Sequence, residues 1–246
     1  MSVTLVSCYY SIPSKRSKEK YIEWLDNFFK NIYANMIIFT NKESRKYLEK
    51  YKKNNILIIE KEFDEFKIYK EYPNIWNQQY AMDSQKYTGR GIYCYLIWNS
   101  KINMVMEAIE KNPFQSDKFI WNDIGNIRKT DLEIDLSIYP RHEKISQNKI
   151  DIICINDFNI NDFNKKYFKD EIHISGSIFG GSTEAWKTFY KIYYEIMDNY
   201  IINNQFIGCD QQLISSCYIC QSDLFNLIKP IHFKYDQWFY LYEYYV

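Results

Sequence analysis

Short apolar segments alternate with amphipathic ones over the first part of the chain, and this alternation limits the possible folds more than any other feature. Residues 3–8, 36–39 and 56–59 have the length and apolar character of buried strands. Residues 17–31 carry apolar side chains at helical spacing, and a Lys-rich helix is expected between the second and third strands. A strand–helix–strand–helix–strand order predicts a parallel sheet with helices on its faces.

The remainder of the chain continues this pattern and contains no linker, internal repeat or low-complexity stretch. We therefore expect one domain over residues 1–246, with an α/β fold whose mostly parallel central sheet is flanked by helices. We expect the aromatic tail at residues 230–246 to pack on the site. The other expected strands cover residues 118–123, 150–155 and 172–179, and the other expected helices cover residues 72–85, 92–111, 209–220 and a segment capped by Ser182.

The charge balance excludes one large class of partners. Lys+Arg and Asp+Glu both number 31, whereas a general nucleic-acid binder needs a clustered excess of cations, so we expect no nucleic-acid partner. No apolar stretch is long enough for a membrane span, and the first residues lack the features of a signal peptide. We therefore expect a cytoplasmic protein. Cys217 and Cys220 have the spacing of a redox or zinc pair, although buried helix thiols are the simpler interpretation.

One carboxylate stands where a predicted strand ends. Asp123 follows the apolar run that begins at Lys118, and Gly125 then allows the backbone to turn away. Ligands of open α/β sheets bind at the carboxyl ends of strands. A carboxylate at such a place suits a divalent cation, and a divalent cation suits a phosphorylated ligand. The alternative, an aspartate that only caps the following loop, stays open.

Four other segments fall near the ends of predicted elements or in the tail. They are the loop after the first strand, the pair Gly180-Gly181, Asp210 at the start of a helix, and the tail residues around His232. Each has a structural alternative: a glycine pair ends a strand, an aspartate favours the helix dipole, and a single histidine is often a packing residue.

As a set, these segments resemble a known family. The pattern Phe-Ile-Trp-x-Asp-x-Gly at residues 119–125, preceded by Trp98 and Lys101 on a helix and by Asn112-Pro113-Phe114, resembles the HtrL/YibB family of bacterial proteins. Members of that family are similar to nucleotide-sugar glycosyltransferases of the GT-A type. The resemblance implies a GT-A-like, Rossmann-like domain that moves a sugar from a nucleotide sugar, most commonly a UDP-sugar, to a glycan or glycoprotein acceptor.

The resemblance also implies roles for individual residues. GT-A enzymes hold a divalent metal on the donor diphosphate through an Asp-x-Asp motif, and here the matching tripeptide ends in the single carboxylate of Asp123. The implied metal is Mn²⁺ or Mg²⁺, held by Asp123 and His232, and Asp210 is the implied base or hydroxyl-orienting carboxylate. Lys15 is a further candidate for contact with the diphosphate. The implied nucleotide-sugar-binding residues are Tyr9, Tyr10, Arg16, Thr40, Asn41, Lys101, Asn122, Gly180, Gly181 and Lys234.

Two alternatives from other functional classes remain open. The missing first carboxylate of the motif favours a catalytically degenerate relative that binds a nucleotide or glycan without transferring sugar. The 24 tyrosines also permit an interaction scaffold, although heavy use of Ile, Asn and Lys indicates codon bias rather than selection for aromatic side chains. Metal-dependent release of UDP from a UDP-sugar separates the enzyme from the first alternative.

Overall fold

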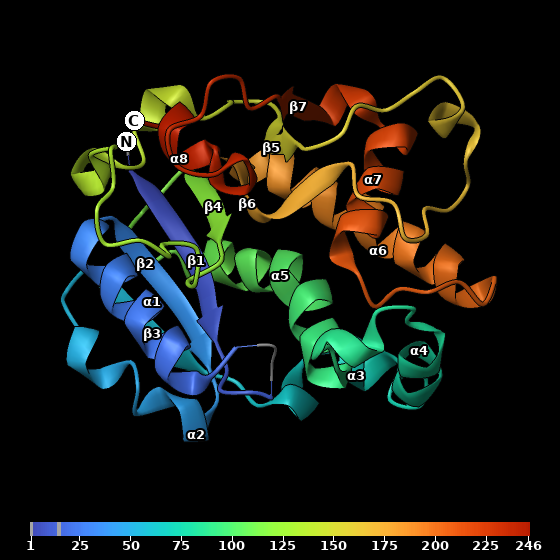
Figure 1. Ribbon diagram of the computed structural model, residues 1–246, viewed down its shortest axis with the longest axis horizontal. Helices are drawn as coiled ribbons and strands as arrows, with labels where there is room; N and C mark the ends of the chain where they lie inside the picture. Colours follow the sequence, from blue (N-terminus) through green and yellow to red (C-terminus); the bar gives the residue numbers. More distant parts are fainter. Residues whose placement is uncertain (1, 14–15) are drawn as a thin grey trace.

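The computed structural model describes residues 2–13 and 16–246, and it confirms the predicted α/β architecture (Figure 1). One seven-stranded sheet has the order β3-β2-β1-β4-β6-β5-β7. The pairs β1/β2, β2/β3, β1/β4 and β5/β7 are parallel, whereas β6 runs antiparallel to both of its neighbours. The strands are β1 (Val3–Tyr9), β2 (Asn35–Thr40), β3 (Ile56–Glu60), β4 (Lys118–Asn122), β5 (Ile150–Cys154), β6 (Ile174–Ser182) and β7 (Phe225–Ile228).

Helices cover both faces of the sheet. Alternate residues of β4 point to opposite sides, so that Phe119 packs in one apolar core with α5 and α6 while Ile120 packs in the other with α1 and the tail. None of the helices in the described part of the chain combines the length and apolar character needed to cross a bilayer. The helices are α1 (Lys18–Asn31), α2 (Lys42–Arg45), α3 (Lys67–Glu71), α4 (Trp76–Met82), α5 (Ile92–Lys111), α6 (Thr183–Ile202), α7 (Asp210–Cys220) and α8 (Leu241–Tyr244).

Three elements differ from the sequence-based expectation. The helix expected over residues 72–85 is shorter than predicted, since within that range only α4 at Trp76–Met82 forms. The preceding helix α3 ends at Glu71, because Tyr72 precedes Pro73 and a residue before proline is disfavoured in the helical region. Strand β6 does not end before Gly180-Gly181 but continues through both to Ser182, which caps α6 as predicted by accepting the Ala185 amide. Strand β7 was not predicted, because its four residues are too few to show a period.

The sheet topology brings a middle section of β6 to the carboxyl end of β4. In the antiparallel register Asn122 lies opposite Ile178, and the Asp123 amide then donates to the Ser177 carbonyl at 2.9 Å. The parallel strand β1 ends at the same edge, since Val6 is paired with Trp121. Asp123 therefore stands between the loop after β1 and the beginning of β6.

Candidate functional site

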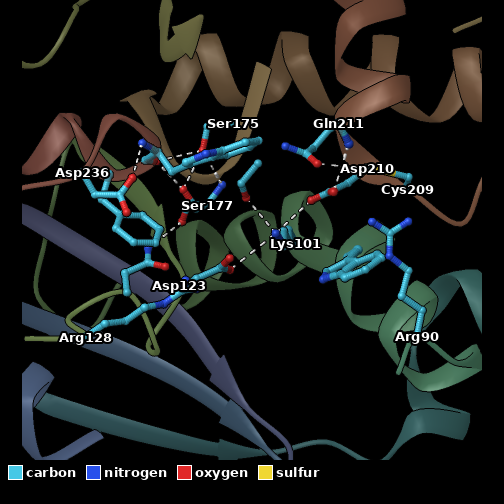
Figure 2. Close-up of a pocket in the computed structure, with 15 residues that line it drawn as sticks. Arg90, Lys101, Asp123, Arg128, Ser175, Ser177, Cys209, Asp210, Gln211 and Asp236 are labelled. Carbon is cyan, nitrogen blue, oxygen red and sulfur yellow. Dashed lines mark hydrogen bonds and ion pairs between the residues drawn. The ribbon is translucent and has the colours of Figure 1, made fainter. Parts of the chain in front are cut away.

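Two adjoining pockets open at this edge of the sheet. The first, here called the carboxylate pocket, has a volume of about 300 Å³ and is shown in Figure 2. The second, here called the aromatic pocket, has a volume of about 380 Å³ and lies along the loop after β1 and the start of α1. Trp98, Asp123, Asn126 and Arg128 line both pockets, so the two form one continuous site.

A buried lysine lies at the centre of the carboxylate pocket. The ammonium of Lys101, on α5, is 2.9 Å from the Asp210 carboxylate and 3.4 Å from that of Asp123 (Figure 2). It also donates to the Gly176 carbonyl at 2.7 Å. Only 4% of its side chain is exposed. Burial by itself lowers the pKa of Lys101, but the two carboxylates outweigh that effect and raise the pKa above its usual value, so Lys101 carries its positive charge at neutral pH.

Asp210 reaches Lys101 because the facing residue of β6 has no side chain. A Cβ on Gly176 would stand 2.8 Å from Asp210 Oδ2, which is closer than real Cβ atoms come to their neighbours. Asp210 begins α7, and its Oδ1 accepts the Gln211 amide at 2.9 Å. Both oxygens of this buried carboxylate therefore have a charged or hydrogen-bonding neighbour.

Asp123 is more accessible than Asp210. Its side chain is 36% exposed, and its Oδ1 accepts a hydrogen bond of 2.8 Å from Nε1 of the buried Trp121. Burial raises the pKa of Asp123, while the ammonium of Lys101 and the indole of Trp121 act in the opposite direction. A partly exposed carboxylate with one fixed oxygen is suited to orient a ligand hydroxyl.

Aromatic rings and cations share the aromatic pocket. Tyr9 and Tyr10 line it together with Tyr21, Trp24 and Trp98, and the cations that line it are Arg16, Lys18 and Arg128. Planar rings suit a nucleobase, and guanidinium groups suit phosphate oxygens. The Arg128 guanidinium lies 4.9 Å from the ring centre of Trp24 and 5.0 Å from that of Phe239, and this places it between the two pockets.

The structure brings six of the predicted site residues to the pockets. Asp123 lines both pockets, and the other five divide between them. Lys15 lies outside the described residues. Tyr9, Tyr10 and Arg16 line the aromatic pocket, and Lys101 and Asp210 line the carboxylate pocket.

Three polar residues that we assigned to nucleotide or sugar contact are used within the fold instead. Thr40 is fully buried, and its hydroxyl donates to the Tyr9 carbonyl at 2.6 Å. The side chain of Asn41 caps α2 by accepting the Ser44 amide. Asn122 is fully buried between two tyrosines. Its amide nitrogen donates to one tyrosine hydroxyl at 2.9 Å, and its amide oxygen accepts from the other at 3.0 Å. Those three assignments are corrected here.

The prediction for the glycine pair is also corrected. Gly180 and Gly181 pair with the amino-terminal half of β4, at the opposite end of the strand from Asp123. A Cβ on Gly180 would lie 2.6 Å from the Ile120 side chain, and one on Gly181 would lie 2.4 Å from the Lys149 carbonyl. These glycines permit close packing between strands, and they line neither pocket.

The tail reaches the site through residues other than those predicted. The hydroxyl groups of Ser175 and Ser177 both donate to the Trp238 carbonyl, at 2.9 Å and 2.8 Å, and Trp238 lines the carboxylate pocket. His232 and Lys234 are exposed and line neither pocket, so the structure does not place them beside Asp123.

The residues at Asp123 do not fit the divalent metal that the resemblance implies. The predicted second ligand, His232, is outside the pocket, and the nearby carboxylate of Asp210 is already paired with Lys101. The dependence on Mn²⁺ or Mg²⁺ stays an untested prediction.

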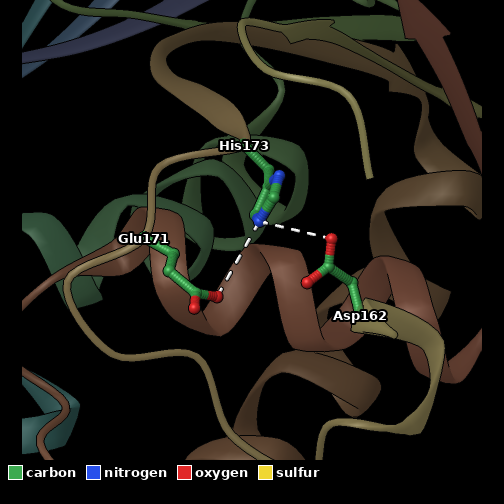
Figure 3. A group of neighbouring side chains, drawn as sticks. All are labelled: Asp162, Glu171 and His173. Atoms are coloured by element: carbon green, nitrogen blue, oxygen red, sulfur yellow. Dashed lines mark ion pairs between the residues drawn. The ribbon is translucent and has the colours of Figure 1, made fainter. Parts of the chain in front are cut away.

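A separate cluster of possible metal ligands also contains a lysine. Asp162, Glu171 and His173 offer ligand atoms within 4.8 Å of one another (Figure 3), and none of them lines either pocket. The Lys165 ammonium lies 2.7 Å from both carboxylates. An ion-pair network therefore accounts for this cluster without a metal.

Several residues of the site were missed from the sequence, and three of them carry charge or shape the carboxylate pocket. Arg128 is an exposed basic residue on an irregular loop, and nothing in its neighbourhood marks it. Gly176 does carry a signal, because the small residues Ser175-Gly176-Ser177 interrupt an apolar strand where a close approach is expected. Arg90, over the Trp98 ring at 5.4 Å, precedes α5 in a segment that gave no strong pattern.

Comparisons with known proteins give the family and support the fold. The sequence model of the family described as "Bacterial protein of unknown function (HtrL_YibB)" matches residues 1–245. Protein HtrL of Escherichia coli (strain K12) is 23% identical over 265 residues, covering 92% of this chain and 87% of that protein. The apo crystal structure of mouse xyloside xylosyltransferase 1 matches with a TM-score of 0.50 at 11% identity, covering 93% of this chain and 85% of that one. This last likeness shows the fold, which is GT-A-like as predicted.

Proposed function

The chain belongs to the HtrL_YibB family of bacterial proteins, and we propose that it transfers a sugar from a nucleotide-sugar donor to a glycan or protein-linked acceptor. The observation that carries the proposal is the pair of connected pockets at the carboxyl ends of β1 and β4. One pocket is lined by aromatic rings and cations, the other by carboxylates, and Asp123 and Arg128 line both. The GT-A-like fold of a named xylosyltransferase supports the same conclusion.

The two pockets divide the donor into its chemical parts. We assign the nucleoside to the aromatic pocket, where Tyr21 and Trp98 have partly exposed rings. The diphosphate then lies at the shared wall, where the Arg128 guanidinium can hold two phosphate oxygens at once. The sugar enters the carboxylate pocket, where the carboxylates of Asp123 and Asp210 accept hydrogen bonds from its hydroxyl groups. A UDP-sugar is the first donor to test.

The transfer breaks one bond and forms another. The bond between the anomeric carbon and the diphosphate oxygen breaks, and the acceptor hydroxyl oxygen bonds to that carbon. Arg128 at the shared wall stabilises the negative charge that develops on the leaving diphosphate. We assign the proton of the acceptor hydroxyl to Asp210, whose own charge is balanced by Lys101 at 2.9 Å.

A thermal unfolding panel of nucleotide sugars tests the binding half of the proposal. A donor at 100 times its dissociation constant stabilises the folded state by about 2.7 kcal/mol. For a chain of this length, we expect that gain to raise the Tm by about 5–10 °C. Failure of every UDP-, GDP-, CMP- and dTDP-sugar to raise the Tm would contradict the proposal and favour an interaction scaffold.

The alternative is a degenerate relative that binds the donor without transferring its sugar. One observation favours it. The end of β4 provides the single carboxylate of Asp123, whereas the Asp-x-Asp motif of GT-A enzymes has two carboxylates. Such a protein raises its Tm with the same ligand but releases no nucleoside diphosphate from it. Release of nucleoside diphosphate therefore distinguishes the two functions, whereas ligand binding alone does not.

A further inference from the structure

The positive charge at the centre of the site is the side-chain ammonium of Lys101. Resting on the proposed function, we propose that Lys101, with Arg128 beside it, replaces the divalent metal, and that this protein binds its nucleoside diphosphate without a metal ion. Lys101 is then a positioning residue, since it holds the two carboxylates that face the sugar. Arg128 is the residue that contacts the diphosphate.

Three oxygen-bearing groups surround the ammonium of Lys101. The Gly176 carbonyl accepts a hydrogen bond at 2.7 Å, and the carboxylates of Asp210 and Asp123 form ion pairs at 2.9 Å and 3.4 Å. The acceptors come from α7, β6 and the end of β4, while Lys101 itself comes from α5. Four elements of the fold thus converge on one buried charge (Figure 2).

Asp123 Oδ1 is a poor ligand for a divalent ion in this arrangement. Mg²⁺ requires about six oxygen ligands at about 2.1 Å, and protein carboxylates normally supply one or two of them. Asp123 Oδ1 is already shared between Trp121 and Lys101, at 2.8 Å and 3.4 Å. An ion bound to that oxygen would lie within about 5.5 Å of the ammonium, since 3.4 Å and about 2.1 Å are joined at one atom. Like charges at this separation repel one another, and the repulsion grows where protein replaces water.

The same pocket provides other positive charges for the diphosphate. Arg90 and Arg128 both line it, and Arg128 is exposed and supported by the rings of Trp24 and Phe239. A guanidinium pairs with phosphate through two parallel hydrogen bonds and keeps its charge at every working pH. The charge that a metal would supply is therefore available from side chains.

Calorimetric titration of the full-length protein with UDP tests the proposal. We measure the dissociation constant in EDTA and again in saturating Mn²⁺, and we expect the two values to agree within about threefold. Binding that tightens about tenfold or more in Mn²⁺ overturns this inference but leaves the proposed function standing. An absence of UDP binding in both buffers overturns the inference together with the choice of donor.

A second measurement does not depend on UDP. The free Mn²⁺ signal in electron paramagnetic resonance is recorded as the wild-type protein, and separately the Asp123→Asn variant, is added. We expect the two titrations to give the same signal, with no loss that is specific to the wild type. A stoichiometric loss that disappears in Asp123→Asn places a metal at this site and overturns the inference. A loss that instead disappears in Asp162→Asn places the ion in the separate cluster and supports it.

Variants of Lys101 complete the test. Lys101→Arg keeps the charge, and we expect it to retain more UDP affinity in EDTA than Lys101→Met, with circular dichroism showing that each is folded. If Lys101→Met does not fold, the Arg128→Gln variant is used, and an affinity loss of about tenfold in EDTA that Mn²⁺ does not restore supports the inference. Full restoration by Mn²⁺ in either variant overturns it.

Discussion

Gly176 and Asp210 touch so closely that a single methyl group on the glycine would collide with the carboxylate. The distance from the position of such a Cβ to Asp210 Oδ2 is 2.8 Å. Gly176→Ala must therefore move Asp210 away from Lys101 or bend β6. We expect it to destabilise the fold by about 1–3 kcal/mol and to weaken donor binding.

Gly91 provides the matched control for that substitution. A Cβ on Gly91 would meet nothing within 4 Å, and its φ of -157° is open to any residue. Gly91→Ala is expected to keep donor affinity, as measured by the ligand-induced shift in Tm. Equal donor affinity in the two variants would show that the position of Asp210 does not matter for binding.

The buried ion pairs of Lys101 make this lysine a strong determinant of stability. Removing its charge leaves the buried carboxylate of Asp210 and the partly exposed one of Asp123 without their cation. Breaking a buried pair such as Lys101–Asp210 costs about 3–5 kcal/mol. Lys101→Met is expected to lower the free energy of unfolding by this amount in urea titrations. Lys234→Met, on the exposed tail, is the control and is expected to leave that free energy unchanged. A loss below about 1 kcal/mol for Lys101→Met would contradict this account.

The raised pKa of Asp123 predicts how stability changes with pH. Because burial makes the folded protein hold this proton more tightly than the unfolded chain does, the stabilising contribution is complete at low pH. It is lost as the pH rises through the raised pKa of the folded state. The difference in unfolding free energy between wild type and Asp123→Asn should therefore fall as the pH rises above the ordinary aspartate pKa of about 3.9.

Asp117 gives the opposite sign and so serves as the control. Burial acts to raise its pKa, but the hydrogen bond with His142 and the other local contacts lower the pKa overall. Its contribution is present above the ordinary aspartate pKa and is lost as the pH falls through the lowered value. The unfolding free energy of the wild type minus that of Asp117→Asn should therefore rise with pH over the acidic range. Two slopes of the same sign would contradict the assigned electrostatics.

Arg128 is expected to matter for ligand affinity more than for folding. Its guanidinium is exposed and stands at the wall shared by the two pockets. Arg128→Gln should weaken binding of a nucleoside diphosphate by about tenfold or more, because a charge-assisted hydrogen bond contributes about 1.5–3 kcal/mol. Arg141→Gln, which removes an exposed pair with Glu143, is the control. Equal affinities in the two variants would remove Arg128 from the site.

Much of the fold could be predicted from the sequence because its elements are long or clearly bounded. Helix α5 covers the predicted residues 92–111, since its apolar period is sustained and Asn112-Pro113 ends it. Gly180-Gly181 was misplaced because a glycine pair marks either a strand end or a close approach between strands, and the sequence does not separate the two. The antiparallel direction of β6 decides the matter, and it is a tertiary property.

The candidate site was less predictable for the same reason. Asp123 and Asp210 could be found because each stands at the boundary of an element, where a carboxylate is conspicuous. Lys101 lies in the middle of α5, and only the resemblance drew attention to it. Its meeting with Asp210 depends on Gly176 in β6, which is far from both in the chain, and no local pattern reports such a contact.

Release of free nucleoside diphosphate from a nucleotide sugar tests the central claim most directly. With the donor that gives the largest increase in Tm, we expect slow release of the diphosphate by the wild-type protein. Asp210→Asn should reduce that rate by about 100-fold or more, and Asp117→Asn, at the other end of β4, should retain it. A folded wild-type protein that binds the donor but releases no diphosphate, or an Asp210→Asn variant that is as active as the wild type, would contradict the proposed function.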